Sequence, residues 1–202
     1  FTFRFPVDVI ARLFGLPDDD LSDFHRWGVE LQCVLFDFER GVRAGRDLSG
    51  YFRPVIEAHR REPREDLLSG LIAAELGGEK LSDEEILGFM RLLLPAGLET
   101  TYRSAGNMLC ALLLHPEQLE AVRERRGLLD AAVEESLRWE TPLTGGLRVA
   151  TRDIELAGVQ VAAGDKVYVC WGAANRDESR WPDAERFDIQ REHKPHLGFG
   201  FG

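Results

Sequence analysis

The sequence predicts a mainly α-helical protein with a small antiparallel β part. Up to about residue 141, apolar residues recur with the helical period of three to four positions. From residue 142 the pattern changes to the alternation that is typical of strands. We therefore expect a single domain in which a helical body covers about residues 1–141, and a β region with an irregular meander and a glycine-rich end covers residues 142–202.

The composition limits the kinds of function that are compatible with the chain. Its 202 residues are 44% hydrophobic and 30% charged, which is ordinary for a folded protein with one sizeable core. A formal charge of −10 argues against nucleic acid or an anionic membrane as the main partner, because both would repel it. The cysteines lack the spacing of a zinc site or a disulfide framework, which fits a reducing cytoplasm. They are Cys33, Cys110 and Cys170.

The two ends of the sequence predict that the chain is an internal piece of a longer protein. It begins with Phe1 instead of methionine, and the first residues lack the basic leader and long apolar core of a signal peptide. It stops within a glycine-rich stretch at residues 198–202.

Four helices are expected before the longest one. Each has an apolar face with helical spacing, and all but the second are followed by helix-breaking residues or end in cations that suit the helix dipole. Their expected ranges are Phe5–Phe14, Leu21–Phe36, Arg43–Arg61 and Asp66–Leu76.

The longest helical pattern begins at Ser82, where a serine followed three residues later by Glu85 predicts a capping box. Apolar residues cover nearly the whole circumference as far as Leu114, so the helix should be buried on most sides. Pro95 and Gly97 weaken its most apolar part, and the proline predicts a bend near Arg91–Pro95.

Two polar residues follow directly in the same apolar helix. Glu99 places a carboxylate where charge is disfavoured unless it is paired or reached by water. Thr100 supplies a hydroxyl that can bond to a carbonyl of the preceding turn or to a ligand. These residues alone are compatible both with a kinked core helix that has a small polar pocket and with a site of chemistry.

Beyond the central helix, two shorter helices and then strands are expected. The helices cover about Pro116–Arg126, with a basic group at Arg123, Arg125 and Arg126 that by itself indicates a solvated face, and Leu128–Trp139. In the second, Glu135 and Arg138 are neighbours on one face, as in many surface ion pairs. Alternation then predicts strands over Gly146–Thr151, where Arg148 would be an ordinary edge arginine, and over Lys166–Trp171.

Four segments, in this order, resemble motifs of the cytochrome P450 family. Residues 96–101, Ala-Gly-Leu-Glu-Thr-Thr, resemble the oxygen-binding motif of its central helix, and Glu135 with Arg138 matches its Glu-x-x-Arg signature. The segment that ends in Arg186 resembles the meander of the family, and residues 196–202 resemble the start of its haem-ligand loop, Phe-Gly-x-Gly-x-His/Arg-x-Cys-x-Gly. The chain is thereby identified as a partial cytochrome P450 domain of the bacterial type, without the N-terminal part and without the haem-ligand cysteine.

The resemblance implies roles for individual residues. Glu99 and Thr100 would be catalytic, the first as a proton relay and the second as a hydrogen-bond partner of dioxygen or an ordered water. Glu135, Arg138 and Arg186 would form a structural triad, and the axial cysteine, the only metal ligand, would lie beyond Gly202. Residues that would contact haem b are Ala96, Gly97, Arg148, His196, Phe199 and Gly200, with Arg148 and His196 at the propionates; Leu93, Leu94 and Leu98 are candidates for the pocket or the haem face.

The implied function is that of a cytoplasmic haem-dependent monooxygenase. It would insert one atom of O2 into a small hydrophobic or natural-product substrate, using electrons from NAD(P)H through a ferredoxin or flavodoxin-type donor. In this family the donor often binds a basic face near the haem thiolate, so the basic group at residues 123–126 is a candidate for docking. The alternative is a truncated, inactive helical remnant or binding module, and the continuation after Gly202 distinguishes the two.

Overall fold

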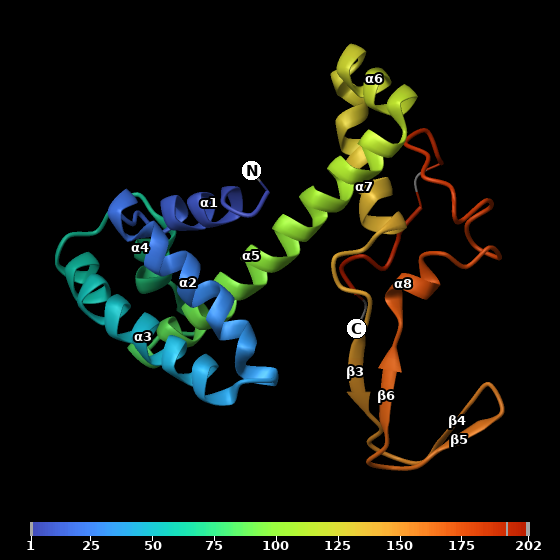
Figure 1. Cartoon of the computed structure of the whole chain (residues 1–202). Helices are drawn as coiled ribbons and strands as arrows, with labels where there is room; N and C mark the ends of the chain where they lie inside the picture. The colour runs from blue at the N-terminus through green and yellow to red at the C-terminus, as the bar shows by residue number, and fades with distance from the viewer. Residues whose placement is uncertain (1, 193, 201–202) are drawn as a thin grey trace. The chain divides into compact units, whose positions relative to one another are not determined.

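The computed structural model describes residues 2–192 and 194–200 (Figure 1). Most of these residues are helical, and the strands pair in small antiparallel sheets, which confirms the predicted fold class. The chain forms two compact units, one up to Tyr102 and one from Arg103. The predicted change from helices to strands near residue 141 therefore falls inside the second unit.

The first unit holds all four of the expected early helices, together with the first part of the long one. Some of their ends differ from the prediction, and at the start of the third helix a side chain supplies the reason. The third helix begins at Phe38 because the carboxylate of Asp37 accepts a hydrogen bond from the main-chain amide of Arg40 at 3.1 Å. The helices are α1 (Phe5–Leu13), α2 (Leu21–Gln32), α3 (Phe38–Arg61), α4 (Leu67–Ala73) and α5 (Asp83–Leu114).

Residues 75–80 form a hairpin at a place where the sequence predicted the end of a helix. Strands β1 (Glu75–Leu76) and β2 (Glu79–Lys80) pair antiparallel, and α4 stops at Ala73. Gly77 and Gly78 have φ angles of 64° and 88°, which glycine adopts without strain. The prediction of a helix up to Leu76 was wrong because these glycines make a hairpin turn.

A buried polar pair joins the end of α3 to the start of α4. The Nε2 of His59 lies 2.9 Å from Oδ2 of Asp66, and the two side chains are only 2% and 6% exposed. The other carboxylate oxygen of Asp66 accepts the main-chain amide of Ser69 at 2.8 Å, which caps α4. Burial by itself would raise the pKa of Asp66, but the hydrogen bonds from Ser69 and His59 outweigh it and lower the pKa below its ordinary value.

The core of the first unit surrounds an aromatic cluster. The rings of Phe14, Phe24 and Phe52 meet edge to face at centroid distances of 5.9–6.5 Å, an arrangement that aromatic quadrupoles favour. One face of α5 completes this core with fully buried side chains. These are Ile86, Leu87, Met90, Leu94 and Leu98.

The start of α5 confirms the predicted capping box. The main-chain amide of Ser82 donates to the carboxylate of Glu85 at 2.8 Å, and the amide of Glu85 lies 3.3 Å from the Ser82 hydroxyl, which accepts from it. The helix is then continuous through Pro95 as far as Leu114.

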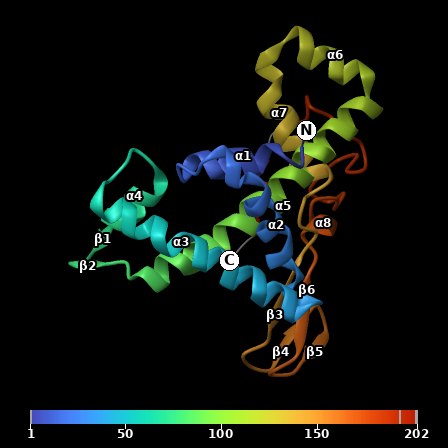
Figure 2. The ribbon, with the colours of Figure 1, turned by 60° about the vertical axis from the view of Figure 1, so that its left-hand side comes forward.

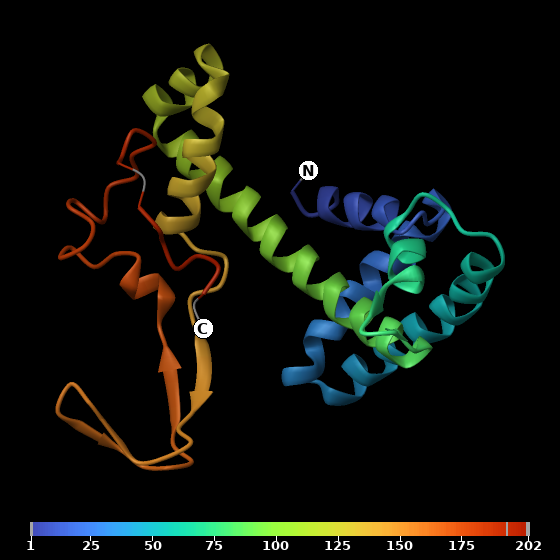
Figure 3. The same ribbon diagram turned by 180° about the vertical axis from the view of Figure 1, so that it is seen from behind.

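In its described residues the second unit contains the end of α5, three further α-helices, a 3-10 turn at Arg126–Leu128 and two strand pairs (Figures 2 and 3). The predicted strands are present as β3 (Gly146–Val149) and β6 (Lys166–Val169), which pair so that Arg148 lies opposite Val167. A second pair, β4 (Ile154–Leu156) with β5 (Val159–Val161), and a short helix, α8 (Trp171–Ala174), were not predicted individually. The remaining helices are α6 (Pro116–Glu124) and α7 (Leu129–Trp139).

The meander after α8 packs against α6 and α7. Phe187 and Ile189 from the meander join apolar residues of the helices in a second buried cluster. The side chain of Gln118 on α6 bonds to both of them, donating to the carbonyl of Phe187 at 2.8 Å and accepting the amide of Ile189 at 2.9 Å. Among the described residues, no helix is both long enough and apolar enough to cross a membrane.

Candidate functional site

The expected site residues belong to both units, so each half is described by itself. The first unit carries the segment from Ala96 to Thr101 on α5. The second carries Arg148, the Glu135–Arg138 pair and the segment from His196 to Gly200.

In the first unit, α5 has an uncovered stripe beside its buried face. Leu92 is 67% exposed and Ala96 is exposed, and Thr100 follows at the same four-residue spacing, so the three lie in line along the helix. Leu94 and Leu98 point the other way and are buried in the core, so their expected place in a pocket or on a haem face was wrong. The surface that α5 offers to a ligand is therefore the stripe through Leu92 and Ala96.

Thr100 uses its hydroxyl within the helix. Its Oγ1 donates to the carbonyl oxygen of Ala96 at 2.7 Å. This is the preceding-turn bond that the sequence left open, and it fixes the hydroxyl oxygen on the stripe. A hydroxyl oxygen also has lone pairs that can accept a hydrogen bond. Glu99, next to it, is half-buried.

Gly97 faces α1. A Cβ atom at Gly97 would lie 2.8 Å from Cδ1 of Ile10, which fills the space that the missing side chain leaves. The close approach of α1 thus accounts for this glycine, in place of the expected haem contact. An apolar groove of about 250 Å³ runs along the same contact. Its lining residues include Phe5, Val9, Leu13, Leu93 and Thr101.

In the second unit, Glu135 and Arg138 form a buried ion pair. Nε and Nη2 of Arg138 each donate to one oxygen of Glu135 at 2.8 Å, and the side chains are 1% and 5% exposed for Arg138 and Glu135. Nη1 of Arg138 donates to the carbonyls of Asn175 and Ala184 at 2.8 and 3.0 Å. This spacing usually indicates a surface ion pair. That interpretation is wrong for Glu135 and Arg138, because α7 buries the pair against the meander.

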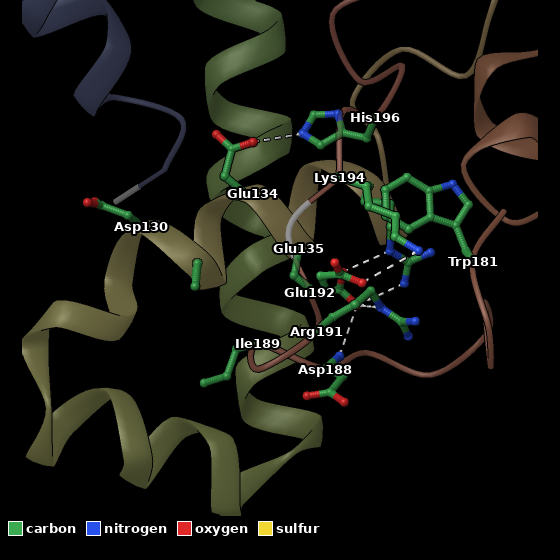
Figure 4. Close-up of a pocket in the computed structure, with 12 residues that line it drawn as sticks. Asp130, Glu134, Glu135, Trp181, Asp188, Ile189, Arg191, Glu192, Lys194 and His196 are labelled. Carbon is green, nitrogen blue, oxygen red and sulfur yellow. Dashed lines mark hydrogen bonds and ion pairs between the residues drawn. The ribbon is translucent and has the colours of Figure 1, made fainter.

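The second guanidinium beside Glu135 is that of Arg191 (Figure 4). Its Nε donates to Oε1 of Glu135 at 3.2 Å, and the same oxygen accepts the amide of Asp188 at 2.9 Å. Arg186, the expected third member of the triad, has an exposed side chain and contributes its main-chain carbonyl, which accepts from Arg138 and from Arg191 at 3.2 and 2.9 Å. Arg191, in place of the expected Arg186, is thus the third side chain of the triad with Glu135 and Arg138.

The sequence predicted Arg186, and it contains no local signal that separates this arginine from Arg191. Arg186 and Arg191 lie five residues apart in an irregular segment, where no period tells which side chain turns inward. The turn after Phe187 decides, because it places Asp188 and Arg191 against α7.

Arg148 lies on β3 with its side chain exposed. Its Nη1 donates to the carbonyl of Leu147 at 3.1 Å, and the same nitrogen is close to Gly146, where a Cβ would lie 3.3 Å from it. A Cβ at Gly146 would also come within 3.1 Å of the Trp171 ring. The guanidinium therefore lies close to Gly146, and it still presents donors to an anion.

His196 is buried, and both of its ring nitrogens have partners inside the second unit. Nε2 lies 3.1 Å from a carboxylate oxygen of Glu134, and Nδ1 accepts the main-chain amide of Gly198 at 2.9 Å. Both nitrogens are thus engaged within the chain, and the propionate contact of His196 stays a prediction.

The glycine-rich segment after His196 is open to solvent on one side. Phe199 is 82% exposed, and Gly200 has a φ of 75° and lies against Trp171, with 3.2 Å between a Cβ placed there and the ring. A side chain at Gly200 would be strained as well as crowded. The other expected loop residues, Phe201 and Gly202, lie outside the described residues.

Comparison with known proteins gives one consistent result. A family model described as Cytochrome P450 matches residues 31–202. The "Biotin biosynthesis cytochrome P450" of Bacillus subtilis (strain 168) is 39% identical over 209 residues, which cover 99% of this chain and 52% of that protein. The "Cytochrome P450 monooxygenase PikC" of Streptomyces venezuelae is 40% identical over 201 residues, or 98% of this chain and 48% of the relative.

A solved structure agrees in three dimensions. "Ligand free structure of Cytochrome P450 TbtJ1" superposes with a TM-score of 0.94 at 38% sequence identity, and it covers 100% of this chain and 55% of the matched chain. The chain thus spans about half the length of the curated relatives that it matches.

Proposed function

Since the chain belongs to the cytochrome P450 family, we propose that the protein containing it is a haem-dependent monooxygenase. In this reaction O2, two electrons and two protons convert a C–H bond of the substrate into C–OH, and the second oxygen atom leaves as water. The observation that carries the proposal is the uncovered stripe on α5, where the Thr100 hydroxyl is fixed to the Ala96 carbonyl at 2.7 Å.

The residues present fit haem, a flat apolar group with two carboxylates. Ala96 leaves the stripe on α5 low enough for a flat ring, and the exposed Phe199 and Gly200 provide an apolar and side-chain-free surface in the second unit. Arg148 supplies an exposed guanidinium that suits a propionate. When bound through a thiolate, haem supplies the activation of O2.

Thr100 and Glu99 would manage the protons of the reaction. The hydroxyl of Thr100 is held by its bond to Ala96, so its oxygen can accept a hydrogen bond at a fixed position on the stripe. Glu99 is half-buried and adjacent to it in the chain, and a positioned carboxylate can transfer protons as a general acid or base. Their roles are delivery of protons and exclusion of misplaced water.

The proposal extends to the substrate and to the source of electrons. The exposed Leu92 on the stripe favours a small hydrophobic or natural-product substrate. Electrons would come from NAD(P)H through a ferredoxin or flavodoxin-type protein, which carries acidic charge. The basic residues Arg123, Arg125 and Arg126, all exposed at the end of α6 and just after it, support docking of such a donor. The cytoplasm is the proposed location.

The test is the reduced-plus-carbon-monoxide difference spectrum of the protein that contains this chain, loaded with haem. We expect the band of a thiolate-ligated haem, together with consumption of O2 and NAD(P)H when a redox partner is added. Bound haem without a thiolate-type band would contradict the proposal and favour an inactive helical remnant.

A further inference from the structure

Glu134, His196 and Gly198 form a continuous chain of hydrogen bonds in the second unit. The carboxylate of Glu134 lies 3.1 Å from Nε2 of His196, and the amide of Gly198 donates to Nδ1 of the same ring at 2.9 Å. Glu134 is on α7, one residue before the buried Glu135, and Figure 4 shows its carboxylate turned toward the imidazole. The two adjacent glutamates therefore hold different parts of the chain.

The contacts of the ring define its tautomer. Nδ1 accepts an amide proton and must carry a lone pair, so the ring proton is on Nε2, which donates to Glu134. A neutral imidazole satisfies both contacts. With its side chain 5% exposed, His196 is a buried connection between a charged helix residue and the main chain of the loop.

The loop is built closely around this ring. A Cβ atom at Gly198 would lie 2.8 Å from Nδ1 of His196 and 2.9 Å from the carbonyl oxygen of Leu137, so only glycine fits. The amide of Leu197 donates to the side-chain oxygen of Asn175 at 2.7 Å, and the amide of Gly200 donates to the carbonyl of Leu197 at 2.9 Å. The amides of Leu197, Gly198 and Gly200 each donate a hydrogen bond, and His196 accepts the one from Gly198.

We propose that Glu134 and His196 are positioning residues that fix the glycine loop at Gly198–Gly200 for cofactor binding. Glu134 acts through the ring of His196, and the ring acts through the amide of Gly198. The role in cofactor binding rests on the proposed haem function. The hydrogen-bond relay depends only on the contacts within the second unit.

The geometry separates this task from that of the Glu135 network. Glu135 and Arg138 are buried and bind the meander, whereas the side chain of Glu134 is 42% exposed, although all three line one cavity of about 250 Å³. A half-exposed carboxylate contributes little to folding. Its loss should therefore affect the loop more than the stability of the unit.

Five variants in the haem-loaded protein that contains this chain test the relay. Glu134→Ala removes the acceptor of Nε2, and Glu134→Gln retains an acceptor oxygen. His196→Asn offers an oxygen in place of Nδ1 for the Gly198 amide, whereas His196→Gln keeps a donor toward Glu134 but loses that acceptor. Asp130→Asn is the matched control. Asp130 lies one turn earlier on α7 and lines the same cavity, and its replacement removes one negative charge, as Glu134→Gln does.

The first readout is hydrogen exchange at the Gly198 amide. Loss of one ordinary hydrogen bond corresponds to about fivefold faster exchange, which we expect in Glu134→Ala and His196→Gln. Glu134→Gln, His196→Asn and Asp130→Asn should stay within about twofold of the parent. Glu134→Ala should add nothing in the His196→Asn background, because its effect passes through the ring.

The second readout is the share of carbon-monoxide-bound protein that shows the thiolate-type band. It should fall in Glu134→Ala and His196→Gln, and Glu134→Gln should restore it. Unchanged exchange at Gly198 in both loss variants would overturn the positioning role and leave the monooxygenase proposal intact. Absence of the thiolate-type band in the parent protein would overturn the proposed function, while the exchange result would still decide the relay.

Discussion

Glu135 holds Arg138 by two parallel hydrogen bonds of 2.8 Å, and both side chains are withdrawn from solvent. The same Glu-x-x-Arg spacing occurs in α6, where Glu120 and Arg123 lie 3.5 Å apart and are 58% and 69% exposed. The chain therefore contains a buried and an exposed example of one sequence pattern. Burial, and not spacing, makes the first of them an anchor for the meander.

Replacing one partner of the buried pair should destabilise the protein strongly. Glu135→Ala or Arg138→Ala leaves the other charge buried without its counter-ion, which costs about 3–5 kcal/mol of unfolding free energy. Glu120→Ala and Arg123→Ala are matched controls and should each change it by less than about 1 kcal/mol. Urea denaturation of the four variants measures the difference, and similar costs for both pairs would contradict the buried geometry.

Arg191 should matter more than Arg186. Arg191→Ala removes the guanidinium that donates to Glu135 and to the main chain of the meander, with an expected loss of about 1–3 kcal/mol. The carbonyl of Arg186 survives any side-chain change, so Arg186→Ala should stay within about 0.5 kcal/mol of the parent. Thermal melts rank the two variants, and the reverse order would restore Arg186 as the third side chain of the triad.

Acid should weaken the joint between α3 and α4. The pKa of Asp66 is lowered from its ordinary value of 3.8 in the folded protein, so the carboxylate contributes stability that is complete above that value and is lost as pH falls through the lower folded pKa. The difference in unfolding free energy between the parent and Asp66→Asn should be largest near neutral pH and should shrink below about pH 3.8.

The neighbouring carboxylate provides the control for this pH dependence. Glu65 is exposed, so Glu65→Gln should follow the parent profile. Urea titrations at a series of pH values give the curves for all three proteins. A constant difference between the parent and Asp66→Asn over the acidic range would show that the Asp66 carboxylate is not the responsible group.

Removal of the Thr100 hydroxyl should slow product formation in the haem-loaded protein that contains this chain. Positioned proton transfer typically contributes about 10²-fold or more to a rate, so Thr100→Ala should lose about that factor with unchanged haem content. Thr100→Ser keeps the hydroxyl and should retain most of the activity. The rate of product formation at equal haem content is the measurement, and an unchanged rate in Thr100→Ala would remove Thr100 from the proton path.

Local patterns were sufficient for helices α1 to α7 and for the two main strands. The period of apolar residues placed α1 to α7, and the serine and glutamate at positions 82 and 85 gave the start of α5 correctly, because a capping box involves residues three apart. The ends of α3 and α4 were less predictable. The start of α3 is set by the cap at Asp37, and the end of α4 by the turn at Gly77–Gly78. In both places the helical period of apolar residues also fits a boundary several residues away.

The site was predictable where a motif names its residues, and not where a contact spans the chain. Glu135 and Arg138 are three residues apart and were identified together. His196 meets Glu134 across 62 positions, and Arg191 meets Glu135 across 56, so the partners depend on the course of the meander. Packing also corrected Gly97, because the apposition of α1 cannot be read from the sequence of α5.

The border between the two compact units, after Tyr102, falls in the middle of α5 and not in a linker. Domains that recombine during evolution are usually joined at exposed, flexible segments, where a cut breaks few contacts. A cut after Tyr102 would instead break about four backbone hydrogen bonds that span it and leave uncapped helix ends on both sides. We therefore expect that a chimera of two relatives retains its fold when its crossover lies in a loop, such as the turn between α4 and α5, and not at the border.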